Sequence, residues 1–376
     1  MIINNIYNRD FINRMQSLLP NKNYYHIDIN TGNFEKIDEV KDKVLNSDLH
    51  IVFDCAMEGY SSIVEKLYNK IIEYKIPEDK VFLVSGATDI KEIVTVVSKS
   101  INKAPINCIW MREFEHYVSV QIRDKHLNRN PKNYQKSFLC LNRRWRLQRP
   151  VFVAKLIQND LLPYGYVSLD LCEVPNFGWD QMKESITETH KDDVNFVNYI
   201  NSNLNHLKNI TPLRLDVESR FLTKPFELQP DLDFFYDTSY FSVVTETNYY
   251  TNSKSYVSNY GAICEATRFL TEKTFKPMAY LHPFILVSTP NMLSLLRQLG
   301  YKTFSPFIDE SYDSELEDCK RMNMIIDEVR KLATLSDTQR DQFLDQTREI
   351  REHNYSLLRT RYTELFDKQL IVDFRS

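Results

Sequence analysis

Residues 241–287 read FSVVTETNYYTNSKSYVSNYGAICEATRFLTEKTFKPMAYLHPFILV and hold the clearest alternation of strand and helix patterns in the chain. The apolar runs at residues 240–245 and 283–287 have the length and composition of buried strands. Residues 271–280 lie between them and carry a helical pattern. A strand, a helix and a second strand in this order predict parallel strands covered by a helix.

The same alternation occurs elsewhere along the chain and gives two series of predicted strands. The first series comprises residues 24–29, 49–54, 80–85 and 106–110, and the second comprises residues 137–142, 164–169, 240–245 and 283–287. After the second series, Ser336 and Gln339 form a capping-box pattern that opens a helical tail. The sequence therefore predicts an α/β protein with two Rossmann-like parallel sheets and long C-terminal helices.

The predicted domains follow these two series. A length of 376 residues exceeds what one core usually accommodates, so two domains are expected. We predict an N-terminal domain over residues 1–130 and a C-terminal domain over residues 131–335. A terminal helix over residues 336–376 is expected to return to the N-terminal domain.

Composition excludes several kinds of binding site. The seven glycines are scattered, so the chain has no P-loop, dinucleotide fingerprint or kinase glycine loop, each of which needs closely spaced glycines. A nucleotide would have to be held by side chains and helix ends. The net charge of −4 restricts nucleic-acid contact to a local basic patch. The sequence has neither a long apolar run nor a secretory signal, which predicts a cytoplasmic protein without a membrane segment.

Four arginines lie between the strand predicted at residues 137–142 and the helix that Pro150 is expected to open: Arg143, Arg144, Arg146 and Arg149. Guanidinium groups bind phosphate oxygens through paired hydrogen bonds, and a helix N-terminus adds partial positive charge. The cluster therefore predicts an anion site. The alternative interpretation is a solvated basic turn.

The stretch of residues 241–287 resembles the donor-binding region of the family-10 glycosyltransferases, the α-1,3-fucosyltransferases. The shared features are a strand that ends near Glu246, a Thr-Glu-Lys sequence at Thr271 that opens a helix, and Ala279 and Pro283 before an apolar strand. Ligands of parallel sheets bind beyond the carboxyl ends of the strands, so Glu246 is also a candidate donor residue. A glycine that is common in the family before the second strand is replaced in this sequence.

The resemblance implies a GT-B fold, in which two Rossmann-like domains face each other across a cleft and the second domain holds a nucleotide sugar. It implies that Glu272 contacts the donor ribose and that Lys273 contacts the pyrophosphate. The family's arginine before the first helix of this domain corresponds to Arg149 or, in another register, to Arg146. A UDP-sugar or a GDP-sugar fits these residues, and no metal is expected. Without the resemblance, Glu272 and Lys273 would be ordinary residues of a first helical turn.

An inverting transfer needs a carboxylate that removes the proton of the acceptor hydroxyl. Asp54 and Glu58 follow one predicted strand of the first domain, and Glu113 and Glu115 follow another. Glu58 is preferred because Glu58 and Gly59 read as an exposed turn, whereas Asp54 closes the strand. Each of these carboxylates can also be a surface residue without a catalytic role.

The acceptor is predicted from a second resemblance and from charge. The runs around Thr271 and Phe307 resemble those of uncharacterised phage proteins, and some phages glycosylate hydroxymethylated cytosine. Residues 123–149 contain nine Lys and Arg against one Asp, with Tyr134 and Trp145 among them, as expected for a duplex DNA surface. The alternative interpretation of this stretch is a charged linker joined to a donor phosphate site. The favoured function is a glycosyltransferase for 5-hydroxymethylcytosine in phage DNA, in the host cytoplasm. A fucosyltransferase-like enzyme with a glycan acceptor and a non-catalytic nucleotide-binding protein are the alternatives.

Overall fold

The computed structural model divides the chain into two compact units. Unit 1 comprises Met1–Glu113, Asn252–Phe269 and Glu364–Ser376, and unit 2 comprises Phe114–Thr251 and Leu270–Thr363. The structure describes residues 23–29, 33–57, 62–122, 133–142, 146–170, 179–215, 228, 230–251 and 267–363. The domain boundaries near residues 130 and 335 stay predictions.

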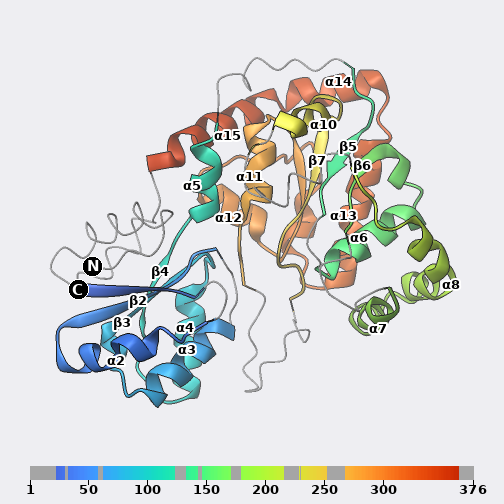
Figure 1. The fold of residues 1–376 in the computed structure, drawn as a ribbon. Coiled ribbons are helices and arrows are strands. Elements are labelled where there is room, and N and C mark those ends of the chain that lie inside the picture. The colour runs from blue at the N-terminus through green and yellow to red at the C-terminus, as the bar shows by residue number, and fades with distance from the viewer. Residues whose placement is uncertain are drawn as a thin grey trace. The chain divides into compact units, whose positions relative to one another are not determined.

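Unit 1 contains a parallel four-stranded sheet with strand order β1-β2-β3-β4. Its strands are β1 (Asn23–Asp28), β2 (Leu49–Cys55), β3 (Val81–Ser85) and β4 (Asn107–Trp110). The connecting helices are α2 (Ile37–Asn46), α3 (Ser62–Glu73) and α4 (Ile90–Ser100). Each connection leads to the next strand on the same side of the previous one. Because such connections are right-handed, their helices lie on the same face of the sheet, as seen in Figure 1.

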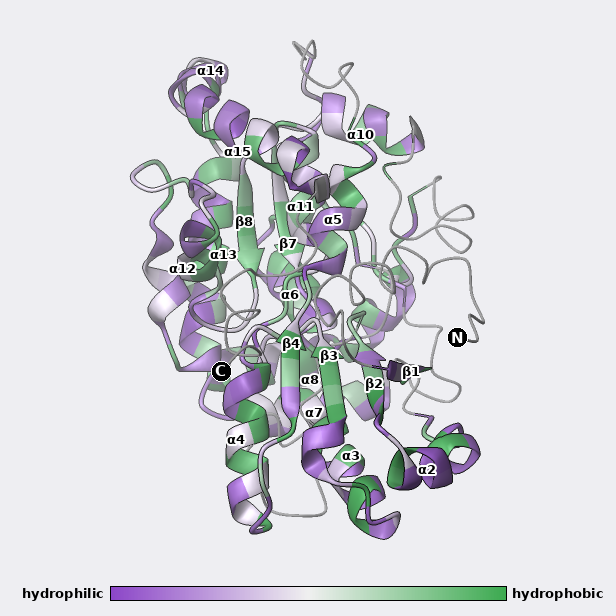
Figure 2. Cartoon of the chain, turned by 90° about the vertical axis from the view of Figure 1, so that its left-hand side faces the viewer, coloured by the Kyte–Doolittle hydropathy of each residue, from purple (hydrophilic) through white to green (hydrophobic). Residues whose placement is uncertain are grey.

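Unit 2 contains a second parallel sheet, whose strand order is β6-β5-β7-β8. Its strands are β5 (Phe138–Cys140), β6 (Gly165–Val167), β7 (Phe241–Thr245) and β8 (Phe284–Val287). Helix α6 (Gln148–Gln158) connects β5 to β6, and α11 (Glu272–Ala279) connects β7 to β8. These crossovers step in opposite directions, so the right-handed rule places α6 and α11 on opposite faces. Strands β3, β7 and β8 are strongly hydrophobic (Figure 2) and buried along their whole length, as expected when both faces of a parallel sheet are covered.

The remaining described elements are mostly helical. Between β4 and β7 lie α5 (Glu113–Ser119), α7 (Trp179–Thr189), α8 (Val194–Ile210) and α10 (Asp233–Asp237). After β8 lie α12 (Met292–Gln298), α13 (Asp318–Ala333), α14 (Asp337–Gln346) and α15 (Arg348–Thr360). Short 3₁₀ turns occur at Glu78–Lys80, Leu162–Tyr164, Pro230–Leu232, Glu310–Ser314 and Arg361–Thr363.

The C-terminal helices of the described chain lie in unit 2. Ser336 and Gln339 form the predicted capping box at the start of α14. Helix α15 packs along α11 (Figure 1). Just beyond it, Arg361 pairs with Glu115 of α5, with Nε and Oε1 3.3 Å apart. Whether the chain after residue 363 returns to the N-terminal domain stays a prediction.

Two parallel sheets followed by long helices confirm the predicted fold class at the level of its elements. That the two domains face each other across a cleft, as in GT-B enzymes, stays a prediction. All eight predicted strands are present, but the one predicted at residues 137–142 is shorter, because the N–H of Asn142 donates to the Ser168 hydroxyl and leaves the ladder. The helix predicted to begin at Pro150 begins at Gln148. Proline fits its first turn because the N–H groups there need no helical partner.

Candidate functional site

The strand order of unit 2 identifies one end of its sheet as the place where a ligand is expected. The chain leaves β5 toward β6 on one side and returns to β7 on the other. Such a reversal is a topological switch point, and ligands of open parallel sheets bind outside the carboxyl ends of the strands at this point. The described strands of unit 1 follow one another in sequence order and contain no such reversal.

Side chains tie the ends of β5 and β7 together at the switch point. Asn142 follows β5 and is buried, and its Oδ1 accepts a hydrogen bond from the Thr245 hydroxyl at the end of β7. Gln148 opens α6, and its Nε2 donates to the carbonyl oxygens of Glu246 at 2.6 Å and Thr247 at 3.0 Å. These hydrogen bonds therefore hold the start of α6 against the end of β7.

Arg149 brings a buried positive charge to this edge. The residue is 3% exposed, and its Nη2 donates to the carbonyl oxygen of Thr245 at 3.4 Å. Burial, together with the charge of Arg146, lowers the pKa of Arg149 to about 10, while the carboxylates of Glu272 and Glu246 act in the opposite direction. The guanidinium thus stays charged at neutral pH and lies in the field of two carboxylates.

Glu246 has no exposed surface and connects the end of β7 to the start of α11. Its Oε1 accepts hydrogen bonds from the N–H of Thr271 at 3.0 Å and the hydroxyl of Thr274 at 2.5 Å. Its Oε2 accepts from the Thr271 hydroxyl at 2.7 Å and from the N–H of Thr247 at 3.2 Å. A buried carboxylate with these partners fixes the first turn of α11.

Glu272 and Lys273 form the first turn of α11, as their predicted role requires. Thr271 caps the helix, and its hydroxyl accepts from the N–H of Lys273. The Lys273 ammonium lies 2.8 Å from the Thr271 hydroxyl and 3.3 Å from Oε1 of Glu272, and its side chain is 26% exposed. Burial alone would raise the pKa of Glu272, but Lys273 and Lys276 together hold it below its ordinary value. The edge therefore presents a reachable ammonium beside an ionised carboxylate.

The structure brings four of the predicted donor residues to one edge of unit 2: Arg149, Glu246, Glu272 and Lys273. Arg146 is half-buried next to them. Arg143 and Arg144 lie outside the described residues. Sequence reasoning missed Asn142, Gln148 and Thr271, although each directly follows a strand or opens a helix.

The predicted acceptor-side carboxylates have different environments. Asp54, near the end of β2, is buried, and its Oδ2 lies 3.1 Å from Nε2 of His26 on β1, while Oδ1 accepts from the N–H of Ala56 at 2.9 Å. Glu58 lies outside the described residues. Glu115 is 1% exposed in unit 2, where it accepts from the Tyr301 hydroxyl at 2.6 Å. Arg361 pairs with the same oxygen of Glu115, and the two contacts anchor α5 to the end of the C-terminal helices.

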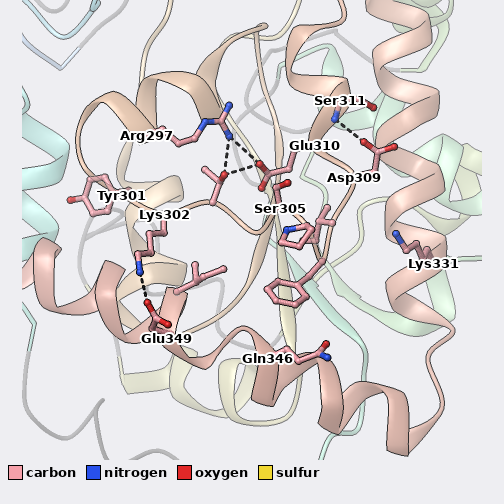
Figure 3. A pocket seen from close by; sticks show the side chains of 15 residues that line it. Arg297, Tyr301, Lys302, Ser305, Asp309, Glu310, Ser311, Lys331, Gln346 and Glu349 are labelled. Carbon is pink, nitrogen blue, oxygen red and sulfur yellow. Dashed lines mark hydrogen bonds and ion pairs between the residues drawn. The ribbon is translucent and has the colours of Figure 1, made fainter.

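A separate cavity of about 1040 Å³ in unit 2 lies between the α12–α13 connection and the α14–α15 junction (Figure 3). Its cations are paired with carboxylates: Arg297 with Glu310 at 3.0 Å, Lys302 with Glu349 at 2.5 Å and Lys331 with Glu328 at 3.3 Å. These pairs leave no excess positive charge for an anionic ligand. The cavity therefore does not compete with the switch point as a phosphate site.

Two further properties concern metals and membranes. Within the ranges that the structure describes, no three His, Cys, Asp or Glu side chains come together in a way that could hold a metal ion. No helix among the described residues is both long and apolar enough to cross a membrane. Metal independence stays a prediction.

Comparison with known proteins gives a structural likeness but no family. No protein-family model matches the chain, and no curated protein matches it. The chain is similar to a solved structure described as the crystal structure of the DNA modifying enzyme beta-glucosyltransferase in the presence and absence of the substrate uridine diphosphoglucose. The identity is 10%, the match covers 94% of this chain and 98% of that chain, and the TM-score is 0.36.

Proposed function

We propose that this protein is an inverting glycosyltransferase that moves a sugar from a UDP- or GDP-sugar to an acceptor hydroxyl without a metal. The observation that supports this proposal most directly is the gathering of Arg149, Glu272 and Lys273 at the switch point of the unit 2 sheet. Cations at this position suit a diphosphate, and a carboxylate suits the two hydroxyls of a ribose.

Each residue of the edge receives a role in this proposal. Glu272 accepts hydrogen bonds from the donor ribose, and Lys273 and Arg149 neutralise the charge that develops on the departing diphosphate. Arg143, Arg144 and Arg146 complete the anion site. Glu246 holds the first turn of α11 in place, so that Glu272 and Lys273 keep their position when the donor is absent.

On the acceptor side, we propose 5-hydroxymethylcytosine in phage DNA as the substrate. The support is the basic stretch of residues 123–149 in a chain whose net charge is −4. A duplex acceptor would require the modified base to be flipped out of its stack before its hydroxyl can attack. Asp54 and Glu58 are the proposed carboxylates that take up the acceptor proton.

A screen of nucleoside diphosphates and nucleotide sugars by thermal shift tests the donor site. A ligand that binds the native state raises the melting temperature, by an amount that grows with its concentration relative to Kd. Donors that bind are then offered to duplexes with and without 5-hydroxymethylcytosine. Transfer to the modified duplex supports the DNA acceptor, and transfer to glycans alone supports a fucosyltransferase-like enzyme. Binding without any transfer or donor hydrolysis supports a non-catalytic nucleotide-binding protein.

A further inference from the structure

The cavity of about 1040 Å³ in unit 2 has the size of a small-molecule site, for which about 300 to 1000 Å³ is usual, and it lies away from the switch point. Helix α13 begins near the carboxyl ends of the strands, where the N–H of Thr251, which follows β7, donates to Asp318 at 3.0 Å. The helix ends at the opposite edge, where the hydroxyl of Ser137, directly before β5, donates to the carbonyl oxygen of Ala333 at 2.9 Å. Because Lys331 in the last turn of α13 lines the cavity, the cavity lies toward the amino ends of the strands.

The charged side chains that line the cavity balance one another. Three cations and three carboxylates are present: Arg297, Lys302, Lys331, Asp309, Glu310 and Glu349. Glu310 and Glu349 belong to the ion pairs described above. Hydrogen bonds from Ser311, aided by the charge of Lys331, hold the pKa of Asp309 below its ordinary value. A ligand with a net charge of either sign therefore gains little from this site.

Arg297 and Glu310 still present hydrogen-bonding groups to a ligand. Nη1 of Arg297 donates to the Thr303 hydroxyl at 2.8 Å and to Oε2 of Glu310 at 3.0 Å. The N–H of Phe304 donates to Oε1 of Glu310 at 2.6 Å and fixes this carboxylate. Nη2 of Arg297 lies 3.9 Å from Asp313, beyond hydrogen-bond distance, and the arginine side chain is 47% exposed. The guanidinium is therefore held in place and keeps N–H donors for a neutral acceptor.

The other groups of interest in the lining are uncharged. Ser305 lies on the connection between α12 and α13, and Gln346 ends α14 (Figure 3). Both side chains are exposed, and neither makes a hydrogen bond to the part of the chain that the structure describes. Pro306 and Phe307 add apolar surface, and the half-buried ring of Phe307 packs on no other ring among the described residues. The cavity thus combines a hydroxyl, an amide and a guanidinium with one accessible aromatic ring.

We propose that this cavity binds a neutral carbohydrate, an inference that goes beyond the proposed function and does not depend on it. A sugar ring carries hydroxyl groups around its rim, each able to donate one hydrogen bond and accept two, and C–H groups on its faces. Gln346 and the Arg297–Glu310 pair supply donors and acceptors for these hydroxyls. The ring of Phe307 supplies a flat apolar surface for one face of the sugar. Since the charges of the site are already balanced, a ligand without charge fits it best.

A peptide is the less favoured occupant of the cavity. Peptide sites commonly extend a sheet edge, seat an apolar helix face or line a groove with several aromatic rings. The residues that line this cavity belong to helices and connections, and Tyr301, the other aromatic residue of the lining, is buried. None of these three modes therefore matches the cavity.

Saturation-transfer NMR on the full chain tests the carbohydrate class. The probes are lactose, maltotriose and chitotriose at millimolar concentration, with 3′-sialyllactose as the charged counterpart of lactose. At least one neutral sugar should receive saturation from the protein. Sialyllactose should bind no more tightly than lactose, because the lining offers no excess positive charge.

Three variants locate the bound sugar. Gln346→Ala removes an exposed amide without an internal partner and should raise the Kd of the sugar by about 2- to 10-fold, the worth of one neutral hydrogen bond. Phe307→Leu keeps an apolar side chain but removes the flat ring, and it should also weaken binding. Gln342→Ala is the matched control, because Gln342 is an exposed glutamine one turn earlier in α14 that does not line the cavity. Nucleoside-diphosphate affinity should stay at the wild-type value in all three variants.

Three results overturn the inference. If no neutral sugar of the panel receives saturation at millimolar concentration, the cavity is not a carbohydrate site. If sugars bind but Gln346→Ala and Phe307→Leu bind them as tightly as Gln342→Ala does, the sugars occupy another part of the protein. If an acetylated and amidated tripeptide binds in preference to every sugar and loses affinity in Gln346→Ala, the cavity belongs to a peptide.

Discussion

The carboxylate of Glu246 holds Thr271 through two hydrogen bonds, one from its N–H at 3.0 Å and one from its hydroxyl at 2.7 Å. Both residues are buried, and they lie 25 positions apart in the sequence. The contact joins the end of β7 to the N-cap of α11 and thereby sets the position of Glu272 and Lys273. The stability of this turn and the affinity of the proposed donor site should consequently be coupled.

Thr271→Val removes the hydroxyl with little change of volume and leaves Glu246 short of a partner. We expect a loss of about 1.5 to 3 kcal/mol in the free energy of unfolding, as is usual for a hydrogen bond to a charged group. Nucleoside-diphosphate affinity should fall as well. Urea denaturation and calorimetry measure the two effects. Thr271→Ser keeps the hydroxyl and should lose much less of both, and equal losses in the two variants would contradict the role given to the hydroxyl.

Lys273→Ala should weaken nucleoside-diphosphate binding by about 1.5 to 3 kcal/mol, or roughly 10- to 150-fold in Kd. The ammonium is partly exposed, so its removal should barely change the unfolding transition. Isothermal titration gives the affinity. Lys331→Ala is the matched control, because Lys331 pairs with Glu328 beside the separate cavity. Unchanged affinity of Lys273→Ala would show that the resemblance misassigned this residue.

Gly86→Ala should destabilise unit 1, because the added Cβ would lie 2.4 Å from both the carbonyl oxygen of Ala56 and the ring of Phe269. Forcing a methyl group into such a space costs about 1 to 3 kcal/mol. The double change Gly86→Ala with Phe269→Leu should recover only part of this loss, since the clash with the Ala56 backbone remains. Full recovery in urea denaturation would show that the ring alone determines the need for glycine.

His190 should make the protein sensitive to acid. It is fully buried between Tyr250 and Cys319, and burial, with a contribution from Lys155, lowers its pKa to about 4. An unfolded histidine has a pKa near 6.5, so the unfolded state binds a proton that the folded state rejects between these values. Stability is therefore complete above about pH 6.5 and decreases as the pH falls toward 4, by about 3 kcal/mol.

Urea midpoints measured between pH 7.5 and pH 4.5 test this dependence. His190→Gln should flatten the curve over this range, whatever it does to stability at neutral pH. His206→Gln changes an exposed histidine of α8 and should leave the curve unaltered. The assignment to His190 is wrong if both variants retain the wild-type slope.

The fold could be predicted because local patterns and tertiary burial agree in the strands. Residues 241–245 and 284–287 are buried in full, as their apolar composition indicates. The end of β5 could not be predicted, because it depends on Ser168, which replaces a strand as the partner of the Asn142 N–H. Nothing in the pattern of residues 137–141 indicates that the Asn142 N–H will bond to a side chain and not to a neighbouring strand.

The candidate site could be predicted where charged residues follow a strand or open the next helix, and not elsewhere. Glu246, Glu272 and Lys273 were found from this rule together with the Thr-Glu-Lys resemblance. Gln148 was not found, because its hydrogen bonds to the carbonyl oxygens after β7 cross 98 and 99 positions of the chain.

The acceptor prediction rests on Lys125, Arg129 and Lys132, which lie in the basic stretch outside the described residues. Neutralising all three should weaken duplex binding and reduce the slope of log K against log salt by about 2.7, at roughly 0.9 for each lost phosphate contact. Donor affinity should persist, because the three residues precede the arginines of the proposed anion site. Binding isotherms at several salt concentrations, with modified and unmodified duplexes, measure the slope. A triple variant that keeps both the wild-type slope and wild-type transfer would reduce this stretch to a charged connector, and the glycan acceptor would become the better hypothesis.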